Sequence, residues 1–148
     1  MLSLLGRALL ALALLTSAHQ IARPEKAGDA VVRNVTMASQ IAPFALLVGA
    51  FVLDASSLDL VARFGGDGLP LFYRISGVWG GRAGPLLLWA AILAVVTWFM
   101  AREGGPAALE VRIMHAWVLA LFVLAWLLEP FAAATGGGAN CTRCCRPT

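Results

Sequence analysis

Four apolar segments, separated by short connectors, constrain the fold of this chain more than any other feature of its sequence. They cover residues 1–18, interrupted by Arg7, then 35–53, 83–101 and 113–128, and the last extends to 134 if Glu129 lies at the membrane interface. A helix of about 20 predominantly apolar residues crosses the ~30 Å hydrocarbon core of a bilayer. The sequence therefore predicts three to four transmembrane helices.

The composition excludes an ordinary soluble domain. Of 148 residues, 60% are hydrophobic and 13% are charged, whereas about a quarter of an average soluble domain is charged. The predicted fold class is thus an all-α integral membrane protein. The net charge of +3 is carried by residues in the connectors, which favours membrane lipid as a partner over nucleic acid.

Two interpretations of residues 1–18 stay open. Arg7, a short apolar core and the small residues Thr16-Ser17-Ala18 fit a cleavable signal peptide. A retained first span is favoured because the positively charged region at the start is weak.

The distribution of basic residues predicts the orientation. Connectors 19–34 and 102–112 carry five of the eleven Lys and Arg residues. By the positive-inside rule they face the cytoplasm. The N-terminus, the loop 54–82 and the tail then face outward. Within this outer loop, the residue pattern predicts a surface helix over residues 54–64. Asp59 and Arg63 are four residues apart, so an ion pair between them is expected.

The end of this loop carries the most specific motif. From Pro70 it reads Pro-Leu-Phe-Tyr-Arg-Ile-Ser-Gly-Val-Trp-Gly-Gly-Arg-Ala-Gly-Pro-Leu-Leu-Leu-Trp. The run resembles the first external loop of the bacterial cytochrome c maturation factor F family, the haem-lyase subunit. The resemblance extends from about Leu2 to Phe131. The motif positions, whose roles stay open, are Tyr73, Arg74, Ser76, Trp79, Gly80, Gly81, Gly84 and Trp89.

The resemblance implies a function for the complete protein. Such a protein takes haem from a haem chaperone, works with thiol-reducing maturation partners, and attaches haem to the Cys-x-x-Cys-His of apocytochrome c. The reaction lies outside the bacterial cytoplasmic (inner) membrane. Residues 1–134 would be the N-terminal transmembrane region of this assembly protein. Where family members often have Glu-Gly-Ser, this chain has Ala83, Gly84 and Pro85, which puts local polar contacts in doubt.

No catalytic, cofactor-binding or metal-binding residue is assigned from the sequence. Family members are several-fold longer, and their tryptophan-rich haem-handling domain and haem-holding histidines have no counterpart here. The chain alone is expected to be inactive. Trp79 with the two glycines after it predicts either a haem-facing platform or an interfacial turn in which glycine allows close backbone approach.

Two other function classes compete with this interpretation. One is a small membrane assembly or interaction subunit without a catalytic role, for which the loop would be the docking surface. The other is a transport component, which predicts intramembrane charges facing a cavity. The second, third and fourth apolar segments have essentially none of these charges.

Four polar residues near the predicted spans are candidate sites. His115 in the fourth segment is a possible haem or proton site, but a histidine this close to an interface more often reaches toward the headgroups. His19 lies in a connector. Asp54 and Glu129 flank spans, and anchoring at the interface is the default interpretation of both.

The tail 135–148 is rich in glycine and cysteine and does not fit the family. Cys141, Cys144 and Cys145 fail the Cys-x-x-Cys-His pattern of haem attachment, and a lone Cys-x-x-Cys has too few ligands for a closed zinc site. Shifting the reading frame at Ala139 gives Glu-Leu-His-Pro-Leu-Leu-Pro in a GC-rich gene. The family continues with a similar Asp/Glu-Leu-Asn-Pro-Leu-Leu segment. A frameshift from about Gly137 is therefore expected.

Sequencing the genomic DNA from the codon of Pro130 onward tests this expectation. The shifted frame should continue into a tryptophan-rich loop and further apolar spans. An early stop in the shifted frame would contradict the frameshift and would favour the interaction-subunit interpretation.

Overall fold

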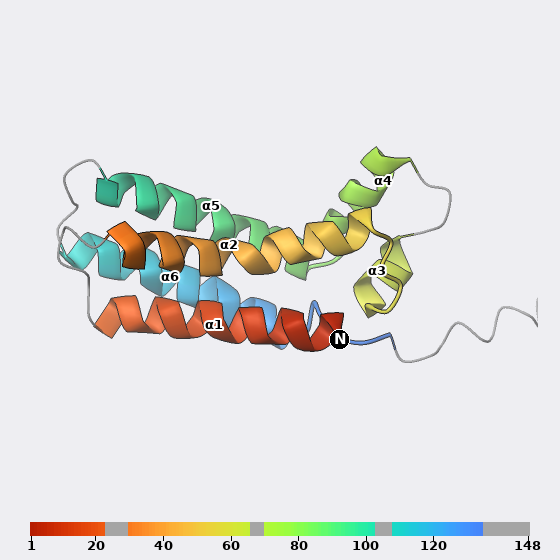
Figure 1. The fold of residues 1–148 in the computed structure, drawn as a ribbon, viewed down its shortest axis with the longest axis horizontal. Coiled ribbons are helices and arrows are strands. Elements are labelled where there is room, and N and C mark those ends of the chain that lie inside the picture. The colour runs from red at the N-terminus through yellow and green to blue at the C-terminus, as the bar shows by residue number, and fades with distance from the viewer. Residues whose placement is uncertain (23–29, 66–69, 103–107, 135–148) are drawn as a thin grey trace, which may run out of the picture.

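The computed structural model describes residues 1–22, 30–65, 70–102 and 108–134, and these form an all-α bundle (Figure 1). The long helices are α1 (Leu2–Ala22), α2 (Ala30–Val52), α5 (Ala83–Arg102) and α6 (Ala108–Leu127). Between α2 and α5 lie α3 (Asp59–Phe64), α4 (Leu71–Ser76) and the 3₁₀ helix η1 (Gly77–Gly80). The predicted fold class is thereby confirmed.

The four long helices run alternately up and down. Packed pairs are α1 with α2, α1 with α6, α2 with α5, and α5 with α6. The start of α1, the end of α2, the start of α5 and the end of α6 therefore meet at one end of the bundle, together with α3, α4 and η1 (Figure 1). This end is called the loop end below. All four helices are long and apolar enough to cross a membrane, as in a multi-pass membrane protein.

Several helix ends differ from the expected spans, including the start of α6 at Ala108 rather than residue 113. α1 continues to Ala22 rather than Ala18, and α2 begins at Ala30 rather than residue 35. Both extensions add polar residues at the end opposite the loop end. The expected span 83–101 differs from α5 by a single residue.

The fourth helix is shorter than expected: α6 ends at Leu127, so residues 128–134 do not continue the span. Glu129 adopts a left-handed backbone with a φ of 46°, and Pro130 cannot donate a backbone hydrogen bond. Together they turn the chain back toward α1, where the ring of Phe131 lies against Gly6. Phe131 is 1% exposed and belongs to the core.

α2 ends in a similar turn. Asp54 has a φ of 50°, a conformation that Asp tolerates better than most residues. The amide of Ala55 donates to the carbonyl of Ala50 at 2.9 Å, the pattern of a Schellman C-cap. This turn prevents the predicted loop helix from starting at residue 54.

Small side chains bring α5 close to its neighbours. Its buried positions include Ala83, Gly84, Leu87, Ala90, Ala91, Ala94 and Thr97. In lipid, helices do not gain from hiding apolar surface from each other, so close packing of small residues supports their association. The exterior remains apolar, since only 22–39% of the residues in each span are buried.

A buried polar cluster joins α1, α2 and α6. The side-chain amide nitrogen of Gln40 donates to the Ser17 hydroxyl at 3.0 Å and lies 3.3 Å from Nδ1 of His115. The Gln20 amide donates to the Thr36 hydroxyl at 3.1 Å. The hydroxyls of Thr16 and Ser39 lie 2.9 Å apart. Each of these bonds crosses between two helices.

His115 therefore does not reach toward the headgroups, and that interpretation of the sequence was wrong. Its side chain is 5% exposed and faces Gln40. An amide nitrogen only donates hydrogen bonds, so Nδ1 of His115 accepts. A buried polar group inside lipid is costly without such a partner.

Replacing Gln40 by alanine should lower the free energy of unfolding by about 1 to 3 kcal/mol, because Ser17 and His115 both lose a buried partner. The measurement is a denaturing-detergent titration of the full chain in mixed micelles. The control is Val35→Ala, at an exposed position of the same helix, where the change should stay within about 0.5 kcal/mol. Equal effects of the two variants would contradict a stabilising role for the cluster.

Candidate functional site

The candidate site is the segment at the loop end that carries the sequence motif. It begins with α3, which is shorter than the predicted surface helix 54–64. The predicted ion pair is confirmed: the Arg63 guanidinium lies 2.9 Å from the Asp59 carboxylate. Leu58 and Val61 are buried on the inner face of this segment. The amide of Gly65 donates to the Val61 carbonyl and ends the helix.

The glycines of the motif are contact points between backbones and side chains. A Cβ atom added to Gly77 would stand 2.7 Å from the Phe51 ring, and one added to Gly80 would stand 2.6 Å from the Phe64 ring. At Gly81 the obstacle is the Leu60 side chain, and at Gly84 it is the backbone carbonyl of Val78. The sequence therefore needs glycine here so that η1 can lie tightly between α3 and α5.

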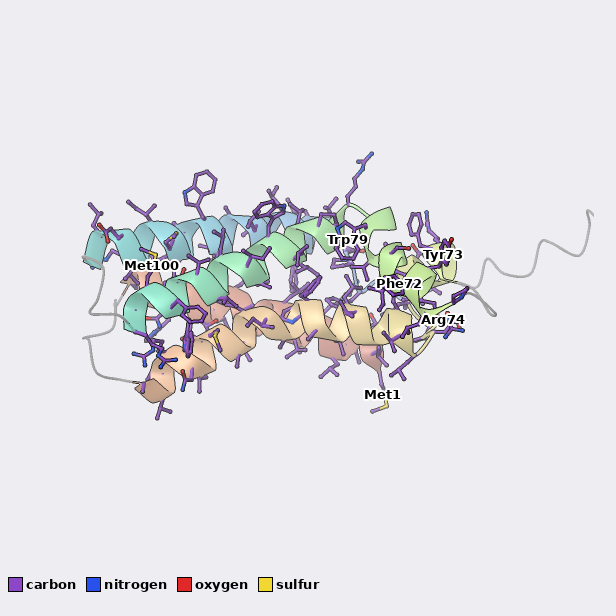
Figure 2. The ribbon with its side chains drawn as sticks, turned by 90° about the horizontal axis from the view of Figure 1, so that it is seen from above. Met1, Phe72, Tyr73, Arg74, Trp79 and Met100 are labelled. Carbon is purple, nitrogen blue, oxygen red and sulfur yellow. The ribbon has the colours of Figure 1, made fainter. Side chains whose placement is uncertain are left out.

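The aromatic members of the motif point outward instead. Tyr73 on α4, Trp79 on η1 and Trp89 on α5 are all more than half exposed. Figure 2 shows Phe72, Tyr73, Arg74 and Trp79 gathered at the loop end. The motif thus combines a rigid glycine-lined underside with an exposed aromatic surface.

The polar members of the motif make local contacts. The Ser76 hydroxyl donates to the Tyr73 carbonyl at 2.8 Å within α4. The Arg74 guanidinium donates to the Val52 carbonyl at the end of α2, at 3.5 Å. Neither contact assembles a catalytic group. The structure therefore gives Ser76 and Arg74 contacts that position α4.

A contact that the sequence did not predict ties this segment to the end of α6. Leu58 and Ala133 form an antiparallel bridge. The Asp59 amide donates to the Ala132 carbonyl, and the Ala134 amide donates to the Ser57 carbonyl, each at 3.0 Å. The sequence signal was weak, because residues 128–134 looked like a continuation of the fourth span.

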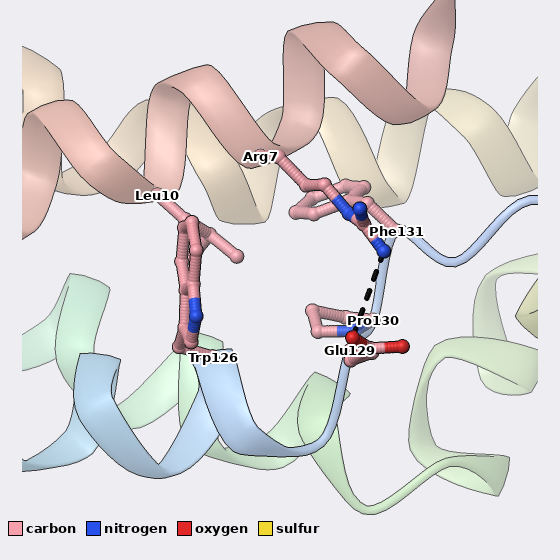
Figure 3. A pocket seen from close by; sticks show the side chains of 6 residues that line it. All are labelled: Arg7, Leu10, Trp126, Glu129, Pro130 and Phe131. Carbon is pink, nitrogen blue, oxygen red and sulfur yellow. Dashed lines mark ion pairs between the residues drawn. The ribbon is translucent and has the colours of Figure 1, made fainter.

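A small pocket lies beside this turn, between α1 and the end of α6 (Figure 3). Its volume is about 80 Å³, and its lining is Arg7, Leu10, Trp126, Glu129, Pro130 and Phe131. The guanidinium of Arg7 and the carboxylate of Glu129 are 3.6 Å apart, and both side chains are largely exposed. Ligand pockets usually hold about 300–1,000 Å³, so this one is too small for a cofactor.

Curated relatives share parts of this sequence. The cytochrome c-type biogenesis protein Ccl1 of Rhodobacter capsulatus is 40% identical over 73 residues, which is 48% of this chain and 11% of that protein. CycK of Rhizobium meliloti, a cytochrome c-type biogenesis protein, is 35% identical over 95 residues, 60% of this chain and 14% of that protein. CcmF of Pseudomonas aeruginosa, also a cytochrome c-type biogenesis protein, is 46% identical over 50 residues, 34% of this chain and 8% of that protein.

These similarities confirm the predicted resemblance to the cytochrome c maturation factor F family. The matched stretches span only about a tenth of the length of the curated relatives. No family model and no solved structure matches the chain.

Neither histidine of the chain lines the pocket described above. A haem iron needs an axial ligand such as His, Cys, Met or Tyr, and space for the macrocycle. His115 is buried against Gln40, and His19 is exposed on α1. Within residues 1–22, 30–65, 70–102 and 108–134, no three His, Cys, Asp or Glu side chains converge as a metal site. The cysteines of the tail lie outside the described residues.

Replacing Gly84 by alanine should destabilise the chain by about 1 to 3 kcal/mol, because the new methyl group would overlap the Val78 backbone. Gly49→Ala is the matched control, since no atom lies within 4 Å of a Cβ at Gly49. That control should be neutral, or stabilising by up to about 1 kcal/mol through helix propensity. Thermal unfolding in detergent compares the two variants. A tolerated Gly84→Ala would show that η1 is not packed as described.

Proposed function

We propose that this chain forms part of a cytochrome c-type biogenesis protein of the bacterial cytoplasmic membrane. The observation that carries the proposal is the 35–46% identity to the Ccl1, CycK and CcmF proteins. The bundle of α1, α2, α5 and α6 would be the N-terminal transmembrane region of a membrane haem lyase. The loop end would face the periplasm.

The role of this region is structural support for haem attachment. In the described residues no three His, Cys, Asp or Glu side chains gather as a metal site. The glycine-lined motif holds an exposed aromatic surface at a fixed place beside the start of α5. The Trp79 part of this surface, next to the start of α5, is suited to packing against the haem-handling part of the enzyme or against its substrate.

The partners follow from this proposal. The complete protein would receive haem from a haem chaperone and would join it to the reduced Cys-x-x-Cys-His of apocytochrome c. Thiol-reducing maturation proteins would keep those cysteines reduced. The chain alone would bind no haem and attach none, because the ring of His115 is already held by Gln40 and the pocket beside Arg7 is too small for the macrocycle.

A chimera tests the proposal. The region of the Rhodobacter capsulatus Ccl1 protein that corresponds to residues 1–134 is exchanged for this chain's residues, and haem covalently bound to c-type cytochromes is stained on a denaturing gel. The chimera should retain most of the haem attachment. A chimera that is present in the membrane at normal amounts but attaches no haem would favour an interaction subunit of another system.

Two tryptophan variants of the chimera test the motif. Trp79 and Trp117 are 52% and 63% exposed, but only Trp79 lies in the loop-end motif. Truncating a tryptophan at a contact that matters costs about 2 kcal/mol or more, so Trp79→Ala should lower haem attachment about thirtyfold or more. Trp117→Ala should leave it nearly unchanged. Equal losses would show that the motif has no special role.

A further inference from the structure

The short helix α4 exposes almost its whole apolar surface. None of its six residues is buried. Leu71 lies at its start, and the next two side chains, Phe72 and Tyr73, are 88% and 66% exposed. A helix this short gains little from its own hydrogen bonds and needs contacts to persist. Within the described part of the chain, those contacts come from α2 and η1.

This exposed surface continues the lipid-facing exterior of the bundle. Arg74 holds α4 to the end of α2 through the Val52 carbonyl. Val52 and Leu53 beside it are themselves exposed apolar residues. The aromatic side chains of α4 therefore lie at the level where the apolar helices end, as Figure 2 shows for Phe72 and Tyr73.

The exposed aromatic area of α4 is small for a protein interface and favours lipid as its cover. An aromatic side chain buries about 150–250 Å², so Phe72 and Tyr73, at 88% and 66% exposure, together offer at most roughly 400 Å². A stable protein interface needs about 800 Å² from each partner. Two aromatics are sufficient, in contrast, to hold a segment at a bilayer surface when four spans already anchor the chain.

We propose that α4 lies in the interfacial layer of the bilayer and is covered by phospholipid. Phe72 then sits among the upper acyl chains, and the ring of Tyr73 lies with its hydroxyl toward the headgroups. Arg82, exposed just after η1, has no ion pair to a carboxylate among the described residues and can meet lipid phosphate. The inference needs only that the four helices span a membrane, so it stands apart from the haem-lyase proposal.

Spin labelling of the full chain in phospholipid nanodiscs tests the proposal. Cys141, Cys144 and Cys145 are first changed to serine, and one new cysteine carries the nitroxide in each variant. Phe72→Cys probes the surface, and Tyr73→Cys repeats the test with Phe72 intact. Ser57→Cys is the aqueous control at the loop end, and Val123→Cys is the hydrocarbon control, since both positions are exposed.

The readout is the ratio of nitroxide collisions with oxygen, which concentrates in lipid, to collisions with a water-soluble nickel chelate. At positions 72 and 73 this ratio should be about threefold or more above that of Ser57→Cys and approach that of Val123→Cys. A ratio equal to that of Ser57→Cys would overturn the proposal, because α4 would then lie in water. Labels that are immobile and shielded from both reagents would also overturn it, since protein would then cover α4.

Discussion

The buried amide of Gln40 is the interaction on which the arrangement of the bundle depends. Near the middle of α2, it contacts Ser17 on α1 and His115 on α6. In lipid, apolar helices gain little from hiding their surfaces from one another. A polar side chain in each of three helices makes one packing clearly better than its alternatives, because every other rotation would leave a donor or acceptor without a partner.

The helix α5, which contributes no side chain to this cluster, is held in a different way. α5 packs through small residues, and its polar contact lies near its end, where the Trp98 indole donates to the Asn34 side chain at 2.7 Å. The Arg102 guanidinium lies over the same indole ring, 4.9 Å from its centre. At the end of the bundle opposite the loop end, this hydrogen bond therefore joins α2 to α5. With both ends fixed, the start of α5 presents Gly84 to η1 at a defined position.

The sequence predicted the elements better than their contacts. Apolar segments of about 20 residues have one stable solution in a membrane, so the four helices could be predicted from composition alone. The end of α6 could not be predicted, because a glutamate such as Glu129 rarely adopts a left-handed turn and no residue pattern indicates it. The polar cluster was also missed. Its one available signal was spacing: Ser17 and Gln20 lie three residues apart, and Thr36 and Gln40 lie four apart, so each pair shares a helix face.

The sequence identifies the motif at the loop end, but only the structure shows how its residues pack. A run such as Trp79-Gly80-Gly81 fits either a binding platform or a tight turn, and both descriptions apply to different sides of the same segment. Gly80 and Gly81 lie against Phe64 and Leu60 underneath, while Trp79 remains half exposed above. A side chain at either glycine would lift η1 from α3 and tilt the aromatic surface with it. The glycines of the motif thereby set the height and angle of the exposed aromatic surface above α3.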